Sequence, residues 1–222
     1  MEQLFTFGGF PEPFLGGSEV QAKRWSREYR SRLIRDDLSN LERVNDLGKM
    51  ELLMLRLPEL VGSPLSVNGL AEDLRASHKA VSHWLDILER LYAVARLSPF
   101  GPAKIRAVKK ERKHYHYDWS LIKDPGPRFE NITAMHLLKW AHFQQDSLGL
   151  DVEVRYFRDV EGREVDFVVL EEGKPSLLNK VQDRRRAALP EPALPESPPE
   201  PLPCACWRPW HDPTGGYCGQ SG

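Results

Sequence analysis

Residues 64–97 constrain the fold most, because one short pattern occurs there twice: a serine followed by a run with helical periodicity. Ser66 precedes residues 67–74 and Ser77 precedes residues 78–91, with only Arg75 and Ala76 between the first run and Ser77. Serine is a preferred N-cap, since its hydroxyl accepts a backbone N–H of the first turn. The positions expected to face inward are Leu70, Ala71, Leu74, Val81, Leu85, Leu88 and Leu91. The pattern predicts a helix-turn-helix, with small Ala71 where two crossing helices approach closely.

The residues that follow extend this prediction to a winged helix. Residues 92–97 are typical of a short strand, 98–103 of a Pro/Gly turn and 105–108 of a return strand. Helix, turn, helix and hairpin is the order of a winged helix. Residues 113–118 alternate histidine and tyrosine and are a further candidate strand.

Two sets of side chains in this region are candidates for contact with duplex DNA. A recognition helix reads DNA with exposed residues near its N-terminus, which here are His78, Lys79, Ser82 and His83. The hairpin is locally basic and would lie along the phosphate backbone through Lys104, Arg106, Lys109, Lys110, Arg112 and Lys113. The alternative is a winged helix that serves only for packing, since Asp86 and Glu89 dilute the positive face and a charge run is often just a solvated surface.

The flanking segments predict helices before this motif and an α/β layer after it. Residues 1–18 are rich in Gly, Pro and Phe, which is typical of a loop. Helices are expected over 19–38, with Ser18 as N-cap and Val20 inward, and over 41–57. A helix over 129–147 is followed by strands at 152–157, 164–170 and 175–181. The predicted class is therefore α/β (α+β).

Overall composition excludes some classes of protein and leaves others open. Lys plus Arg number 31 against 32 Asp plus Glu, so a nucleic-acid partner has to be argued from local patches. No apolar run reaches the roughly 18 residues of a membrane helix, and residues 1–10 lack the features of a signal peptide, so we expect a cytoplasmic protein without a membrane partner. All three cysteines fall in the last twenty residues, which excludes a disulfide framework for the core.

Six short motifs, taken in order, resemble one protein family. They are Gly8-Gly9-Phe10-Pro11-Glu12, Tyr29 with Arg35-Asp36-Asp37-Leu38, Leu88-Glu89-Arg90-Leu91-Tyr92, His116-Tyr117-Asp118-Trp119-Ser120-Leu121, Arg128-Phe129-Glu130-Asn131 and Arg163-Glu164-Val165-Asp166-Phe167. Over residues 5–178 the chain resembles the C-terminal half of prokaryotic AAA-superfamily P-loop ATPases. That half combines a winged helix with a domain of unknown function similar to the PD-(D/E)XK nuclease, or restriction-endonuclease-like, fold.

The chain departs from that family at both ends. The ATPase half would precede Gly8, but no G-x-x-x-x-G-K-[ST] loop occurs in this sequence, so we expect no ATP site and no ATP hydrolysis. The family's last strand carries Glu-x-Lys, whereas the aligned positions here read Lys180-Val181-Gln182. Residues 184–222 are dense in proline and predicted to be disordered. We interpret this change as a frameshift near residue 179, with an authentic divergent tail as the alternative.

The resemblance also implies a set of nuclease residues, now vestigial. Asp166 and Glu130 match the family's acidic positions, and Glu164 shares the face of Asp166, so the three would hold Mg²⁺ weakly at most. Lys180 replaces the second-strand acid and Gln182 replaces the lysine, which removes both a metal ligand and the charge stabiliser. We therefore expect no cofactor and no working nuclease.

These observations predict four segments and rank three functions. The segments are a helical connector at 1–63, a winged helix-turn-helix at 64–118, a truncated nuclease-like α/β domain at 119–183 and a disordered tail at 184–222. The favoured function is a non-catalytic remnant of an AAA-family ATPase that binds duplex DNA or regulates through its winged helix. The alternatives are a module that docks on an ATPase or another protein without touching DNA, and a degenerate Mg-dependent nuclease.

Overall fold

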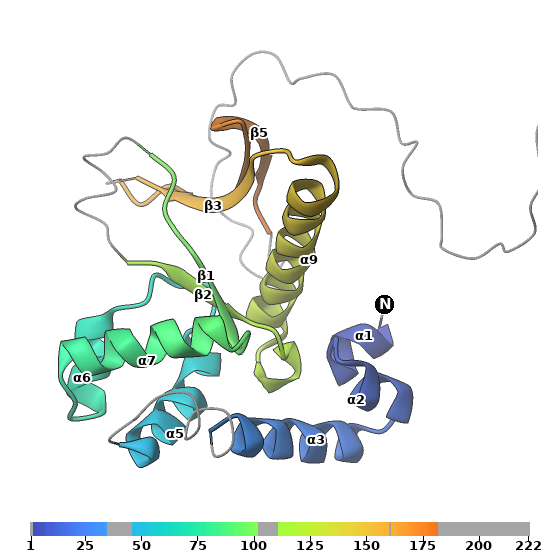
Figure 1. Cartoon of the computed structure of the whole chain (residues 1–222), viewed down its shortest axis with the longest axis vertical. Helices are drawn as coiled ribbons and strands as arrows, with labels where there is room; N and C mark the ends of the chain where they lie inside the picture. The colour runs from blue at the N-terminus through green and yellow to red at the C-terminus, as the bar shows by residue number, and fades with distance from the viewer. Residues whose placement is uncertain (1, 35–45, 102–110, 160, 182–222) are drawn as a thin grey trace, which may run out of the picture. The chain divides into compact units, whose positions relative to one another are not determined.

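The helix-turn-helix forms as the sequence predicts. The computed structural model describes residues 2–34, 46–101, 111–159 and 161–181. Helix α6 (Val67–Asp73) and helix α7 (His78–Arg90) lie next to each other (Figure 1). The hydroxyl of Ser66 accepts the N–H of Gly69 at 3.3 Å, and that of Ser77 accepts the N–H of Ala80 at 3.1 Å. Both predicted caps are therefore confirmed, because each hydroxyl accepts one of the free N–H groups of a first helical turn.

A two-stranded antiparallel hairpin follows α7. Strand β1 (Val94–Leu97) pairs with strand β2 (Lys113–His116), and Val94 lies opposite His116. The strand predicted at 113–118 is confirmed but ends two residues earlier. The return strand predicted at 105–108 lies outside the described residues.

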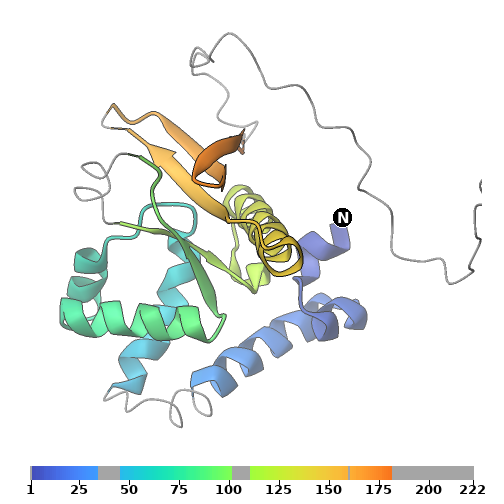
Figure 2. The ribbon, with the colours of Figure 1, turned by 45° about the horizontal axis from the view of Figure 1, so that its top comes forward.

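The α/β layer contains one long helix and a three-stranded antiparallel sheet. Helix α9 (Pro125–Leu148) begins at the N-cap Asp124 and ends at Gly149, whose φ of 66° suits the left-handed C-cap position. The strands are β3 (Val152–Arg158), β4 (Glu164–Glu171) and β5 (Lys174–Asn179), in the spatial order β3-β4-β5. Figure 2 shows α9 beside this sheet. The mixed helical and antiparallel content confirms the predicted α/β (α+β) class.

The loop predicted at residues 1–18 is wrong, because two short helices form there. They are α1 (Glu2–Phe7) and α2 (Pro11–Gly16). Pro11 begins α2 and Gly17 ends it in the left-handed conformation, which is the asymmetry typical of helix ends. The Gly and Pro residues thus mark helix boundaries. Gly9 is also required for packing, since a Cβ there would lie 2.2 Å from the Trp119 ring.

Two more helices precede the helix-turn-helix, and the buried face of the first differs from the prediction at Val20. Helix α3 (Glu19–Arg32) buries Ala22 and Ser26, whereas Val20, predicted to face inward, is 69% exposed. The reason is polar: Ser26 donates a 2.5 Å hydrogen bond to the buried carboxylate of Asp118. Helix α5 (Leu47–Arg56) begins at the N-cap Asp46 and continues into the 3₁₀ turn η2 (Leu57–Leu60); residues 41–45 lie outside the described part.

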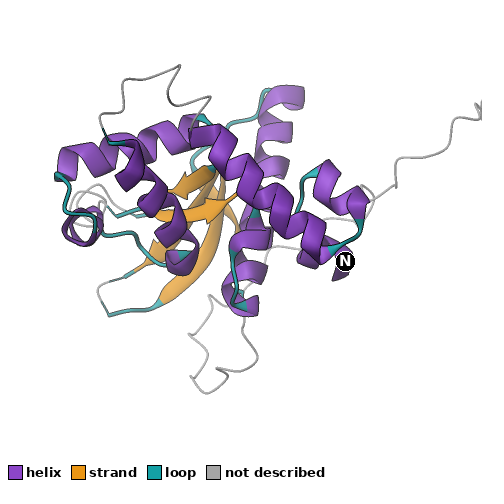
Figure 3. Ribbon diagram, turned by 90° about the horizontal axis from the view of Figure 1, so that it is seen from below, coloured by secondary structure: helices purple, strands orange, loops and turns teal. Residues whose placement is uncertain are grey.

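The buried apolar residues form two clusters, and β2 lies between them. One cluster joins the end of α3, α5, α6, α7 and the start of β1. The other joins Tyr115 of β2, the turn η3 (Trp119–Leu121), α9 and the sheet β3-β4-β5. Figure 3 shows strands flanked by helices on more than one side. Both clusters lie within one compact unit, residues 1–186, and the tail from 187 lies outside the described residues.

Among the described helices, none is both long enough and apolar enough to cross a membrane.

Candidate functional site

The side chains predicted to read DNA lie at the N-terminus of α7. His78, Lys79 and His83 are exposed and Ser82 is half-buried. The carboxylates of Asp86 and Glu89, further along the same helix, are partly buried. Four of the predicted hairpin residues, Lys104, Arg106, Lys109 and Lys110, lie outside the described residues.

Two arginines pair with the acids that dilute the positive face of α7. Arg96 of β1 is largely buried; it donates to Asp86 Oδ1 at 2.5 Å and, through Nε, to Glu89 Oε2 at 3.0 Å. Burial by itself lowers the pKa of Arg96, but the two carboxylates outweigh it and raise the pKa. Arg112 also approaches Glu89 at 3.6 Å. Asp86 therefore pairs with an arginine of β1, and Glu89 pairs with that arginine and with one that directly precedes β2.

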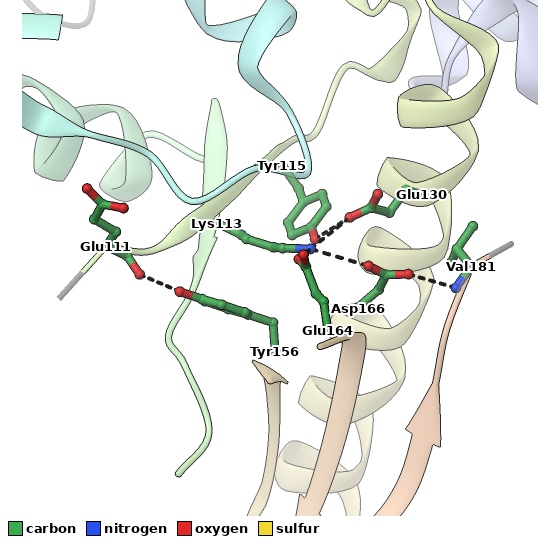
Figure 4. Close-up of polar contacts among 8 residues, drawn as sticks. All are labelled: Glu111, Lys113, Tyr115, Glu130, Tyr156, Glu164, Asp166 and Val181. Carbon is green, nitrogen blue, oxygen red and sulfur yellow. Dashed lines mark hydrogen bonds and ion pairs between the residues drawn. The ribbon is translucent and has the colours of Figure 1, made fainter. Parts of the chain in front are cut away.

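Lys113 lies elsewhere than predicted. The prediction that it belongs to an exposed basic surface is wrong, because its side chain is only 1% exposed. Its ammonium lies 2.6 Å from Glu164 Oε1, 3.4 Å from Glu130 Oε1 and 3.4 Å from Asp166 Oδ1. These acids come from β4 and α9, and Figure 4 shows all three converging on the ammonium. We call Lys113, Glu130, Glu164 and Asp166 the lysine cluster.

Neighbouring groups complete the hydrogen bonds of the cluster. Tyr115 donates its hydroxyl to Glu130 Oε1 at 2.9 Å, and the backbone N–H of Val181 donates to Asp166 Oδ2 at 2.8 Å. A side chain at Gly62 would meet the Glu130 carboxylate at 2.8 Å, so this glycine leaves room for the acid. The predicted shared face of Glu164 and Asp166 is confirmed, because both reach the same ammonium.

Electrostatics keep the lysine of the cluster protonated. Burial alone lowers the pKa of Lys113, but the charges of Glu130, Glu164 and Asp166 overcome it and raise the pKa above its usual value. Burial, with help from Asp166, raises the pKa of Glu130 against the opposing effect of Lys113. Burial and the Glu130 carboxylate raise the pKa of Tyr115 well above normal. Lys113 is thus an ammonium at neutral pH and not a general base.

The cluster does not fit the Mg²⁺ site that the family resemblance implies. Mg²⁺ requires oxygen ligands around a free position, but the Lys113 ammonium fills the point where the carboxylates converge and would repel a second cation. Across residues 2–34, 46–101, 111–159 and 161–181, no group of three or more His, Cys, Asp or Glu is arranged to hold a metal ion. Lys180 is exposed just beyond β5, and Gln182 lies outside the described residues.

The opposite face of β2 carries buried histidines that sequence reasoning did not single out. His114 Nε2 lies 2.8 Å from the carbonyl oxygen of Leu57, and the backbone of His116 exchanges two hydrogen bonds with the amide of Asn131, at 2.6 and 2.7 Å. Burial lowers the pKa of His114 to about 4 and that of His116 to about 3. The available signal was the sequence Lys-His-Tyr-His itself, whose period of two assigns lysine and tyrosine to one face and the histidines to the other.

Comparisons with known proteins place the chain in a family without defining an activity. Residues 1–124 match the family described as "Domain of unknown function (DUF8612)", a stretch that includes α6, α7 and the β1–β2 pair and ends before α9. The chain is also 20% identical over 184 residues to the uncharacterized protein MJ1544 of Methanocaldococcus jannaschii, covering 78% of this chain and 40% of that relative. This chain therefore spans well under half the length of the curated relative that it matches. No solved structure matches the chain. Because the family match covers more than half of the sequence, the chain belongs to the DUF8612 family.

Proposed function

We propose that this chain is a non-catalytic module that binds duplex DNA through its winged helix and acts in the context of an AAA-family ATPase. The observation that carries the proposal is the exposure of His78, Lys79 and His83 on the first two turns of α7, the second helix of the helix-turn-helix, since a recognition helix reads DNA from its N-terminal part. The ATPase context rests on the sequence resemblance alone.

The ion pairs that Asp86 and Glu89 form with arginines support the same proposal. Carboxylates on a DNA-facing helix repel phosphates, but Arg96 and Arg112 neutralise these two acids within the protein. Lys79 then remains as an exposed cation on the first turn of α7. A DNA surface needs this balance, because phosphate neutralisation supplies most of the non-specific affinity.

Reversal of one charge on α7 tests the proposal. Titration of a fluorescent duplex with the full chain should give salt-dependent binding, and Lys79→Glu should weaken it by roughly 10-fold and lower the salt slope by about 1. Lys139→Glu is the matched control, since Lys139 is an exposed lysine on α9. Equal affinity of wild type and Lys79→Glu, or an equal loss in both variants, would contradict the proposal.

A second candidate function is protein docking without DNA contact. Phe129, Trp140 and Phe143 are exposed on α9, at spacings that place them along one helical face. Exposed aromatic side chains of this kind are typical of protein interfaces. If the affinity for duplex DNA depends on Lys79, this candidate is disfavoured. If Trp140→Ala abolishes binding to an ATPase partner and leaves duplex binding unchanged, this candidate is favoured.

A further inference from the structure

A cavity of about 220 Å³ lies between β1 and β3. The two segments are bonded directly at one end, where the N–H of Tyr156 donates to the carbonyl of Ser98 at 3.3 Å and the carbonyl of Tyr156 accepts the N–H of Phe100 at 2.6 Å. Pro99 forms a parallel bridge there. Away from this end the cavity separates the two strands. We call it the β1–β3 wedge, and it is lined by residues 96–98, residues 152–155 and, from α9, Leu138, Ala141, His142 and Gln145.

Both strands direct backbone groups into the wedge. The backbone groups of successive residues point to alternate edges of a strand. The carbonyl of Ala93 pairs on the β2 side, so the N–H and C=O of Arg96, three residues later, point to the opposite edge. The carbonyl of Asp151 pairs on the β4 side, so those of Val154 point toward β1. Among the described residues, the backbone bonds that cross from the β1 segment to β3 are those of Tyr156, so the groups of Arg96 and Val154 face the cavity without crossing it.

A side-chain amide already pairs with one of these edge groups. Gln145 of α9 donates through Nε2 to the carbonyl of Val152 at 2.6 Å. A primary amide carries the same kinds of donor and acceptor as a peptide group. Free N–H and C=O groups along a strand edge are a template for pairing with another extended chain. At the floor of the wedge, Ala141 is buried and adds only a methyl group, which leaves room for a small apolar side chain.

We propose that the β1–β3 wedge binds the end of an extended segment from a partner protein, through backbone hydrogen bonds to both strands. The segment has to end before Tyr156, because paired strands lie only about 4.8 Å apart and leave no space for a third strand between them. Main-chain bonds give such strand addition its affinity, and side-chain pockets give it its selectivity. The proposal does not depend on DNA binding, since the wedge is built from β1, β3 and α9.

Backbone amide NMR of the full chain measures occupancy of the wedge. The probe is N-acetyl-alanine methylamide, and the control probe is its analogue methylated at both amide nitrogens, which keeps the acceptors but has no donor. We expect saturable shifts at the amides of Arg96, Ser98 and Val154 with the first probe and none with the second. Shifts that do not saturate, or that are equal with the two probes, would overturn the proposal.

Two substitutions should change the affinity for the first probe in opposite directions. Ser98→Pro removes an N–H at the wedge and keeps the carbonyl that pairs with Tyr156, so binding should weaken by about 3- to 10-fold, the factor that one lost hydrogen bond supplies. Ser98→Ala, which keeps the N–H, is the matched control and should bind like wild type. Gln145→Ala frees the carbonyl of Val152, so binding should strengthen by a similar factor.

The gain in Gln145→Ala keeps the test decisive, because a loss of folding does not strengthen binding. Unchanged affinity in both Ser98→Pro and Gln145→Ala would overturn the proposal. Shifts at the same amides that grow with protein concentration in the absence of probe would overturn it as well, because a second copy of the chain would then fill the wedge.

Discussion

The two faces of strand β2 bury polar groups in opposite ways. Lys113 and Tyr115 face α9 and the sheet, where a full positive charge meets three carboxylates. His114 and His116 are equally buried, but burial keeps them neutral, and His114 Nδ1 and His116 Nε2 lack a hydrogen-bond partner among the described residues. Strand β2 is thus fixed by charge on one face and by neutral polar contacts on the other.

The difference follows from what each face can offer. A buried charge is tolerated only when it is paired and hydrogen-bonded, and Glu130, Glu164 and Asp166 satisfy that condition for Lys113. Among the described residues, His114 meets the Leu57 carbonyl at 2.8 Å, and the charges of Arg96 and Arg30 oppose protonation of the two histidines. Disturbance of the first face should therefore cost more than disturbance of the second.

The largest effect is expected from removal of the cation. Lys113→Met leaves three carboxylates facing one another in a largely buried site, and we expect a loss of roughly 3–5 kcal/mol in the free energy of unfolding. Urea unfolding at neutral pH measures it. The triple variant Lys113→Met/Glu130→Gln/Asp166→Asn should recover much of the loss, since it removes two of the three unpaired charges and leaves only Glu164 charged. A loss below about 1 kcal/mol in Lys113→Met, the range of exposed ion pairs, would show that the lysine cluster is not a buried ion-pair network.

A smaller loss of stability is expected when Asn131, which bonds the backbone at the end of β2, is replaced. The amide of Asn131 satisfies both the N–H and the C=O of His116 and is fully buried. Asn131→Ala should cost roughly 2–4 kcal/mol, because two buried backbone groups lose their partners. Thr133→Ala, two residues further along the same helix, is the control; its hydroxyl donates to the helix carbonyl of Phe129. Similar costs in the two variants would mean that the backbone of His116 finds other partners.

The smallest expected effect is the pH dependence of the free energy of unfolding. A loss of stability at acidic pH is the sign expected for the buried histidines of β2. A histidine with a lowered folded-state pKa binds its proton first in the unfolded state, so stability falls as pH drops from about 6.5 toward the folded pKa. For His114 and His116 those folded values are about 4 and about 3. Each histidine should remove about 1 kcal/mol between pH 7 and pH 5.5. In His116→Phe the pH-dependent loss should be about half that of wild type. An unchanged pH profile would show that His116 is not buried as a neutral ring.

How much the sequence predicts depends on whether the signal is local. The caps of α6 and α7 and the period of their apolar residues lie within a few positions, so both helices and their order before a hairpin were predictable. The partners of Lys113 lie 17 and 53 residues away for Glu130 and Asp166. A basic stretch in the sequence does not reveal that its last residue turns inward toward acids of other elements. The acids themselves were predicted to share a site, but the cation among them was not.

The most direct test of the account maps the surface that duplex DNA covers. Backbone amide NMR of the full chain, with and without a duplex at low salt, should show shifts concentrated at residues 78–83 and 111–112, with little change along the exposed face of α9. Shifts confined to residues near Phe129, Trp140 and Phe143, or no shifts at any duplex concentration, would contradict DNA binding by the winged helix.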